Sequence, residues 1–235
     1  MANWFEKAAG PSVPLALVYL ELAISLTFLA TVVHFRSLRR TRDELAAVRL
    51  YFIAFFALLL AVPCFIVFLT SSGPWPALAS FGWTFGRTGL GFALAGAGLP
   101  LAVLAGFIGS HDPQMIKMYP FAKAACADAR TFAGYELSYL FLYYLPWEFV
   151  FRGVLFLPLV PVLGLLPALA IQTAISTLLH IGHPDTEVFA AAVAGLVFGA
   201  IAYATGSFLY TFILHAATGI ATDTFLFLRR GSGKP

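Results

Sequence analysis

Long apolar blocks separated by short polar connections restrict the fold of this chain more than any other feature. Hydrophobic residues make up 60% of the chain and charged residues only 11%, against about a quarter charged residues in soluble domains. Most blocks have about the 17–25 residues that an α-helix needs to cross a bilayer. The sequence therefore predicts an all-α membrane protein, a polytopic bundle of about seven transmembrane helices in the lipid bilayer. The third block is long and rich in glycine, so we expect it to tilt or break. The predicted spans are residues 13–35, 47–70, 78–108, 132–157, 160–181, 187–205 and 207–228.

The distribution of Lys and Arg predicts how these spans are oriented. Positive residues fill the first and third connections and the C-terminal tail, whereas the connections near residues 71–77, 158–160 and 205–207 carry none. Because positive loops stay on the cytoplasmic side, we expect an N-out, C-in protein that is integral to the cell (inner) membrane. The net charge of +3 comes from these anchoring residues and indicates no nucleic-acid partner. The residues are Arg36, Arg39, Arg40, Arg42, Arg49, Lys117, Lys123, Arg130, Arg229, Arg230 and Lys234.

Glu148 and Arg152 are charged residues inside the fourth apolar block. An ionisable side chain at bilayer depth costs at least a few kcal/mol, so it persists mainly where it pairs or performs a function. The two residues are four apart, which places them on one face of a helix with the glutamate on the N-terminal side. We expect an ion pair, which taken alone could be purely structural.

Two histidines accompany this pair on other predicted helices. His180 ends the fifth block and His215 lies inside the seventh. A lone histidine in an apolar helix is usually a hydrogen-bonded packing residue, but two of them beside a buried carboxylate more often mark a polar cavity. A carboxylate and two imidazoles are also what water activation requires, since one group takes a proton and others polarise the reacting oxygen.

The order and spacing of these residues resemble the CPBP family, which holds the CAAX prenyl endopeptidases, bacteriocin-processing and immunity (Abi) proteins and related membrane peptidases. The resemblance covers about the last 95 residues and implies three parts: N-terminal transmembrane helices in 1–130, a CPBP-like catalytic core in 131–228 and a basic cytoplasmic tail in 229–235. The motifs that carry it are Glu148-Phe149-Val150-Phe151-Arg152-Gly153, Leu178-Leu179-His180, Ala194-Gly195-Leu196-Val197-Phe198-Gly199, Thr205-Gly206-Ser207 and Ile213-Leu214-His215-Ala216.

Two positions depart from the family pattern. The pattern has two adjacent glutamates before the arginine, and the first of these positions is Trp147 here. It also has Asn or Asp four residues after the second histidine, where this chain has Gly219. Asp223 is a secondary candidate for the missing polar group, and the hydroxyls of Thr218 and Thr222 are others. Both departures are also what a degenerate, inactive member would show.

A single glutamate in a WEFxFRG-type motif is similar to a bacterial subgroup of the family, whose members include C-terminal sorting-signal peptidases (myxosortase-like). In that subgroup the first histidine is followed by Gly, a basic residue, Pro and then Glu, which makes Glu187 a further candidate for the site. A solvated interface residue is the alternative interpretation of Glu187. This resemblance implies protein sorting in a bacterial membrane.

The resemblance implies an intramembrane endopeptidase that hydrolyses a peptide bond in a membrane-anchored protein or peptide substrate. Glu148 would be the general base, Arg152 would hold it, and His180 and His215 would orient water and stabilise the oxyanion. We expect no cofactor, although zinc held by Glu148, His180 and His215 is the alternative, because the family is described both as glutamate-type and as metal-dependent.

Two functions of other classes remain open. One is a non-catalytic membrane scaffold or immunity protein that binds an unknown partner protein through the same helices. Trp147 and Gly219 favour this alternative, whereas the joint presence of the four site residues argues against it. A small transporter could use buried charges as a proton relay, but the sequence has no inverted pattern of interrupted helices.

The orientation can be tested with single cysteines at positions 40, 72 and 231 in a background that lacks Cys64 and Cys126. In intact cells a membrane-impermeant thiol reagent should label only the cysteine at position 72, because the other two positions lie in the expected cytoplasmic connections. Labelling at position 40 would contradict the N-out, C-in arrangement.

Overall fold

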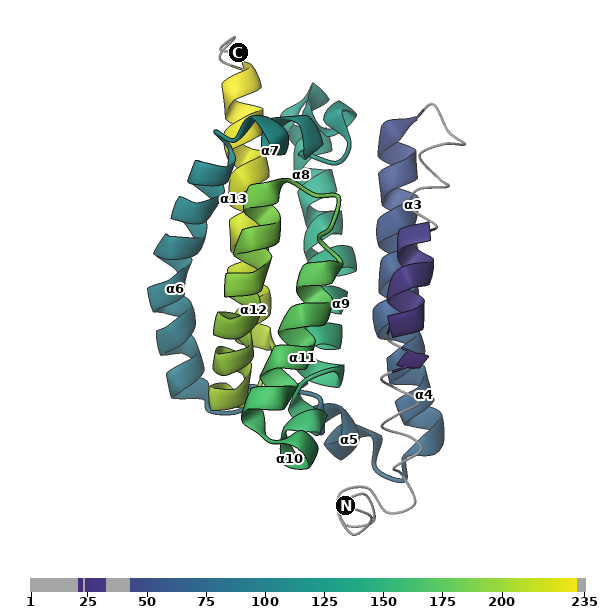
Figure 1. Ribbon diagram of the computed structural model, residues 1–235. Coiled ribbons are helices and arrows are strands. Elements are labelled where there is room, and N and C mark those ends of the chain that lie inside the picture. The colour runs from purple at the N-terminus through teal and green to yellow at the C-terminus, as the bar shows by residue number, and fades with distance from the viewer. Residues whose placement is uncertain (1–20, 23, 33–42, 232–235) are drawn as a thin grey trace.

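The computed structural model describes residues 21, 22, 24–32 and 43–231 (Figure 1). All regular secondary-structure elements in this part of the chain are helices. The only strand-like feature among these residues is an isolated bridge between Ile181 and His183. Most of the predicted first span, residues 13–35, lies outside the described residues; 21, 22 and 24–32 are helical. The all-α prediction is confirmed.

Five helical stretches of the described chain are long and apolar enough to cross a bilayer. The first, Glu44–Thr70, consists of α3 (Glu44–Phe56), the π-turn η1 (Ala57–Ala61) and α4 (Val62–Thr70). Asp43 caps its start by accepting bonds from the backbone N–H groups of residues 45 and 46. The others are α6 (Thr88–Gly109), a composite stretch Ala129–Leu163, α12 (Asp185–Thr205) and α13 (Leu209–Gly231).

The predicted third span, residues 78–108, is broken, one of the two outcomes expected from its length and glycine content. A short helix, α5 (Pro74–Ser80), ends before an irregular segment, and the spanning helix α6 begins only at Thr88. Gly82 (φ 84°) and Gly86 (φ 48°) have positive φ angles that side chains other than glycine rarely adopt. These glycines turn the chain, so the span is ten residues shorter at its start than 78–108 suggests.

The composite stretch corresponds to the predicted fourth span. It runs through α8 (Ala129–Tyr139), the π-helical η3 (Leu140–Tyr144), α9 (Leu145–Glu148), the π-helical η4 (Phe149–Val154), η5 (Leu157–Leu159) and α10 (Val160–Leu163). Glu148 therefore lies between two wide π turns. Such turns occur frequently at functional sites, because they redirect side chains within a helix.

The predicted fifth span, residues 160–181, is divided at Gly164 (φ 84°), which separates α10 from α11 (Leu165–Leu178). With 14 residues at 1.5 Å each, α11 is about 21 Å long, shorter than the hydrocarbon core of roughly 30 Å. His180 follows the end of this short helix. The helix ends early, and the predicted boundary at residue 181 is too late.

Small residues let the inner helices approach closely. Gly195 and Gly199 of α12 face α11, where an added Cβ would come within 3.0 Å of Thr173 or Gln172 atoms. The Gln172 side chain donates to the Gly195 carbonyl at 2.7 Å, which a larger residue at 195 would prevent. On the other side, Gly106 of α6 meets the backbone of α13 at Thr218. Close packing of this kind is typical of membrane helices.

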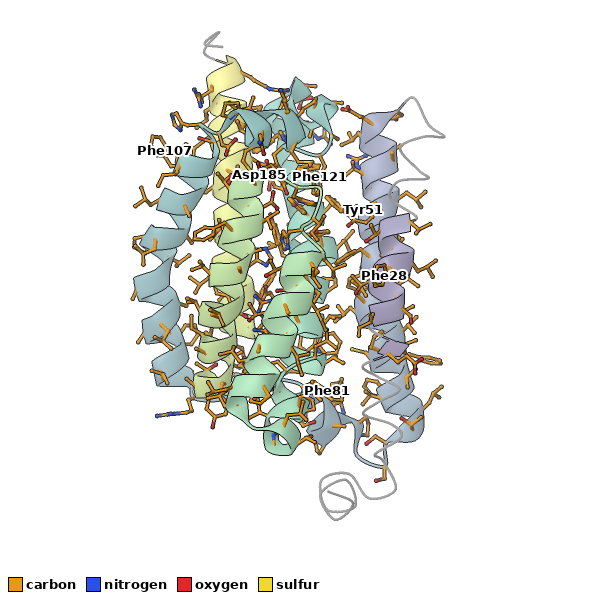
Figure 2. All side chains as sticks on the ribbon, viewed as in Figure 1. Phe28, Tyr51, Phe81, Phe107, Phe121 and Asp185 are labelled. Carbon is orange, nitrogen blue, oxygen red and sulfur yellow. The ribbon has the colours of Figure 1, made fainter. Side chains whose placement is uncertain are left out.

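An aromatic core joins α3 to the composite stretch. Phe52 stacks on Tyr139 with ring centroids 4.8 Å apart, and Phe55 stacks on Tyr143 at 4.5 Å and on Trp147 at 6.0 Å. Side chains fill the space between α3 and the central helices near Tyr51 (Figure 2). In Figure 1, α11, α12, α13 and the α8–α9 stretch form the centre of the bundle, with α6 and α3–α4 on opposite sides. The remaining helices, α7 (Pro113–Met118) and η2 (Lys123–Ala127), lie at the end of the bundle that also holds the C-terminal end of α13.

Candidate active site

Glu148 is the most deeply buried charged residue of the predicted site. Its side chain is 0% exposed, and one of its oxygens, Oε2, lies 3.3 Å from the Nε atom of Arg152. The predicted i, i+4 ion pair is therefore present. Arg152 is almost as buried and places its guanidinium carbon 5.5 Å from the centre of the Phe198 ring. Because each charge is out of water, each needs the other.

His215 connects α13 to this pair. Its Nδ1 atom lies 2.7 Å from the other Glu148 oxygen, Oε1. An ionised carboxylate can only accept hydrogen bonds, so Nδ1 carries the proton and donates it. In the neutral imidazole, Nε2 then keeps a free lone pair and can act as a base. Arg152, Glu148 and His215 form one connected chain of three groups.

His180 lies in the connection between α11 and α12. Its Nδ1 atom is 2.7 Å from the backbone carbonyl oxygen of Ser176, which can only accept, so Nδ1 is again the protonated nitrogen. Its Nε2 atom lies 3.9 Å from the Oε1 atom of Glu187. The hydrogen bond to Ser176 thus orients the His180 ring, and Nε2 faces a second carboxylate, that of Glu187.

Glu187 belongs to the first turn of α12 and is mostly buried, with 19% of its side chain exposed. The Tyr119 hydroxyl donates to its Oε1 atom at 2.7 Å, and His183 Nδ1 lies 3.1 Å from the same oxygen. Of the two interpretations of this residue, a solvated interface position does not fit these contacts. Tyr119 reaches it from the connection after α7, and Gln114 of α7 donates to Asp185 at the start of α12 at 3.3 Å, which joins these two segments at the same end of the bundle (Figure 2).

A cavity of about 140 Å³ lies among these groups. Roughly 10–15 Å³ is enough to hold one water molecule, so the cavity has room for several. His180, His215, Arg152 and Glu187 line it together with tyrosines of the composite stretch and alanines of α12, but Glu148 is not part of its wall. Glu148 is thus connected to the cavity through His215 and Arg152.

Trp147, the first departure from the family pattern, lies against both histidines. Its ring centroid is 5.2 Å from that of His180 and 6.4 Å from that of His215, and both contacts are edge-on. The indole is 5% exposed and stacks on Phe55 from the other side. Trp147 therefore forms part of the cavity wall and packs against both imidazole rings.

The second departure from the family pattern, Gly219, leaves space for the side chain of Tyr144. An added Cβ at this position would overlap the hydroxyl of Tyr144, whose ring also lies edge-on to His215 with centroids 4.9 Å apart. The Tyr144 hydroxyl therefore occupies the space of a side chain at position 219. This role of Tyr144 was not predictable from the sequence, because it depends on the close approach of η3 and α13.

The other candidates for the missing polar group are not joined to the site in the same way. The hydroxyls of Thr218 and Thr222 line the cavity but donate to carbonyls of their own helix, at 3.0 Å each. Asp223 is 0% exposed, interacts with the buried carboxyl group of Glu136 on α8 and does not line the cavity. The geometry therefore does not support its assignment to the site, because Asp223 and Glu136 form a separate pair of carboxyl groups.

The zinc alternative can be compared with this geometry. Among the described residues, no three His, Cys, Asp or Glu side chains converge closely enough to hold one metal ion. The Glu148 carboxylate is bonded to His215 and paired with Arg152, whose positive charge opposes a second cation there. Glu148, His180 and His215 therefore do not fit a zinc site in this arrangement.

Comparison with known proteins identifies the region that contains the site. Residues 131–221 match the family model described as type II CAAX prenyl endopeptidase Rce1-like. The matched segment contains Glu148, Arg152, His180, Glu187 and His215, and the CPBP-family resemblance is confirmed over these residues. No curated protein and no solved structure matches the chain.

The contact between Tyr144 and Gly219 can be tested by a pair of alanine substitutions. Gly219→Ala should lower the free energy of unfolding by about 1–3 kcal/mol, because the new methyl group overpacks against the tyrosine. Gly96→Ala in α6 is the matched control, since an added Cβ there meets nothing within 4 Å. Thermal unfolding in detergent should show a lower midpoint for the first variant only; equal midpoints would contradict the assigned contact.

Proposed function

We propose that this membrane protein, whose residues 131–221 are those of a type II CAAX prenyl endopeptidase Rce1-like region, hydrolyses peptide bonds inside the bilayer. The observation that carries the proposal is the connected chain Arg152, Glu148 and His215, which ends at a cavity with room for several water molecules. The substrate would be a membrane-anchored protein or peptide that enters the cavity from the lipid. Sorting of exported proteins by a bacterial inner-membrane enzyme stays part of this proposal.

The general base in this mechanism is the Glu148–His215 pair. A fully buried carboxylate with both oxygens engaged is poorly placed to contact water itself, whereas His215 lines the cavity with a free Nε2 lone pair. His215 Nε2 takes a proton from water while the water oxygen bonds to the carbonyl carbon. The imidazolium is stabilised by Glu148, as a carboxylate behind a catalytic histidine does in other hydrolases.

The second half of the reaction returns the same proton. The C–N bond of the tetrahedral intermediate breaks as the amide nitrogen takes the proton from His215 Nε2. The products are a carboxylic acid and an amine, and His215 is neutral again. His180 orients the attacking water from another part of the cavity wall, because its unprotonated Nε2 can accept a hydrogen bond from that water, and Arg152 keeps Glu148 ionised and in register.

The non-catalytic scaffold is less well supported than the peptidase. A scaffold needs only an outer surface and has no use for charged groups buried around a cavity, which cost free energy in a membrane. Trp147 and Gly219, which favour the scaffold by sequence alone, both contact the histidines or their neighbours. Their presence is therefore compatible with an intact site.

The substitution Glu148→Gln tests the proposal. It keeps the size of the side chain but removes the negative charge that stabilises the imidazolium, so cleavage should fall at least about 10²-fold. The assay incubates the purified protein in lipid nanodiscs with a mixture of synthetic peptides, including C-terminally prenylated ones, and detects new termini by mass spectrometry. Cleavage at the parental rate by the folded variant, or no product that depends on Glu148, would contradict the peptidase.

Folding must be measured in parallel, because removing one partner of a buried ion pair can cost about 3–5 kcal/mol. Glu136→Gln serves as the control. It removes another buried carboxyl group from the same helical stretch, but Glu136 does not line the cavity. The control variant should retain cleavage, which separates a general effect of losing a buried carboxyl group from the specific loss of Glu148.

The metal question has its own test. We expect a strong chelator to leave the rate of peptide cleavage unchanged, since the proposed steps use only side chains and water. Added zinc should likewise give no increase. Loss of cleavage with the chelator and recovery with zinc would instead assign Glu148, His180 and His215 as metal ligands.

A further inference from the structure

An oxyanion forms on the substrate carbonyl when water attacks, and it needs a hydrogen-bond donor. Neither histidine of the site has a proton to spare for it. His180 donates its Nδ1 proton to a backbone carbonyl, and its side chain is 12% exposed, which favours the neutral ring with no proton on Nε2. His215 donates its Nδ1 proton to Glu148, and the leaving amide nitrogen needs the proton that Nε2 takes from water. The donor therefore has to come from another side chain at the cavity.

Most hydroxyl groups at the cavity wall already donate to acceptors within the protein. The hydroxyls of Ser176, Thr218 and Thr222 donate to carbonyls of their own helices. The hydroxyl of Tyr119 donates to the carboxylate of Glu187 at 2.7 Å. These four protons are therefore not available to a bound substrate.

The hydroxyl of Tyr144 has a different environment. It is hydrogen-bonded to the hydroxyl of Tyr139, whose ring centroid lies 4.3 Å from that of Tyr144. The π-helical η3 lies between the two residues, and its i→i+5 turn brings positions five apart onto one face. When Tyr139 donates to the Tyr144 oxygen, the Tyr144 proton is left for a group in the cavity, which Tyr144 lines. A hydroxyl that accepts one hydrogen bond is also a stronger donor in the next.

This hydroxyl lies beside the proposed base. The Tyr144 ring is edge-on to that of His215, with centroids 4.9 Å apart, and its oxygen fills the space of a side chain at Gly219. His215 and Gly219 are four residues apart on α13, so they share one face of the helix, and both line the cavity. A base and an oxyanion donor have to flank the same carbonyl group. His215 and Tyr144 occupy neighbouring places on one wall, as this requires.

We propose that Tyr144 is a catalytic residue whose O–H group donates a hydrogen bond to the oxyanion of the tetrahedral intermediate. The inference rests on the proposed peptidase function. As the water oxygen bonds to the carbonyl carbon, the π electrons of the C=O bond move onto its oxygen, where the Tyr144 O–H group meets the growing charge. When the C–N bond breaks, the C=O bond forms again and this charge is lost. Gly219 takes part indirectly, because it leaves the space that the phenol occupies.

Tyr144→Phe tests this role, since it removes the hydroxyl and keeps the ring. With the best-cleaved peptide of the mixture in nanodiscs, kcat should fall about 10²–10³-fold, the usual loss for one oxyanion donor. KM should change little, because the bond strengthens only as the charge develops. A folded variant with the parental kcat would overturn the proposal and leave the oxyanion to the N–H groups of Arg152 or Trp147.

Tyr143→Phe is the matched control. It removes the hydroxyl of the adjacent tyrosine, which also lines the cavity but whose hydroxyl is bonded to that of Tyr51 on α3. Its kcat and KM should equal those of the parental protein. An equal fall of kcat in this variant would mean that any hydroxyl lost from the wall slows the reaction, and the specific role of Tyr144 would be wrong.

A pair of double variants gives an independent readout. Tyr144→Ala empties the space beside α13, and Gly219→Asn in that background returns an amide N–H donor to it, one helical turn from His215. Its kcat should exceed that of Tyr144→Ala with Gly219→Ala, which has a side chain without a donor, about 10-fold or more. If Tyr144→Phe does not fold, this comparison decides alone, and equal kcat values would overturn the proposal.

The two hypotheses fail in different ways. Parental cleavage in Glu148→Gln, or no Glu148-dependent product, removes the proposed peptidase and this inference with it. Cleavage that depends on Glu148 but proceeds at the parental kcat in Tyr144→Phe leaves the peptidase intact and overturns only the role of Tyr144.

Discussion

The buried carboxylate of Glu148 is the group around which the inner bundle is arranged. An ion of this kind is expensive in a low-dielectric interior unless it is paired and hydrogen-bonded. Arg152 supplies the opposite charge from the next turn of the same stretch, and His215 supplies a hydrogen-bond donor from α13. The position of α13 against the composite stretch is therefore constrained by chemistry as well as by packing. Loss of either partner would leave a charge that nothing else compensates.

The two departures from the family pattern have a common physical explanation. Trp147 and Tyr144 lie on the helical stretch that precedes Glu148, and each places an aromatic ring beside His215. The indole fills the wall where the pattern has a glutamate, and the phenol fills the space that Gly219 leaves open. A carboxylate is still present at the cavity, but it comes from Glu187 on α12. A carboxylate and a hydroxyl group, from Glu187 and Tyr144, are therefore present at the cavity although positions 147 and 219 supply neither.

The sequence predicted those parts of the fold and site that depend on local spacing. The apolar blocks predicted the helices, and the i, i+4 relation predicted the Glu148–Arg152 pair, because both are set within one helix. Contacts between distant segments were not predictable in the same way. The bond between His215 and Glu148 joins residues 67 positions apart, and the burial of Glu187 depends on Tyr119, 68 positions away. A break in the third span was expected from its length and glycine content, but its position at Gly82 and Gly86 was not, because apolar composition continues through it.

The early end of α11 is related to the presence of the cavity, because the irregular connection that follows the helix lines it. Irregular backbone at bilayer depth is tolerated only where it is buried in protein or lines a water-filled space, since lipid cannot satisfy its polar groups. The connection after Leu178 is irregular, and it carries His180 into the wall of the cavity. Its Nδ1 atom satisfies the Ser176 carbonyl, one of the last in α11, which would otherwise lack a partner at the helix end. This hydrogen bond at the end of α11 also fixes which nitrogen of His180 faces Glu187, so the helix end and the site share one contact.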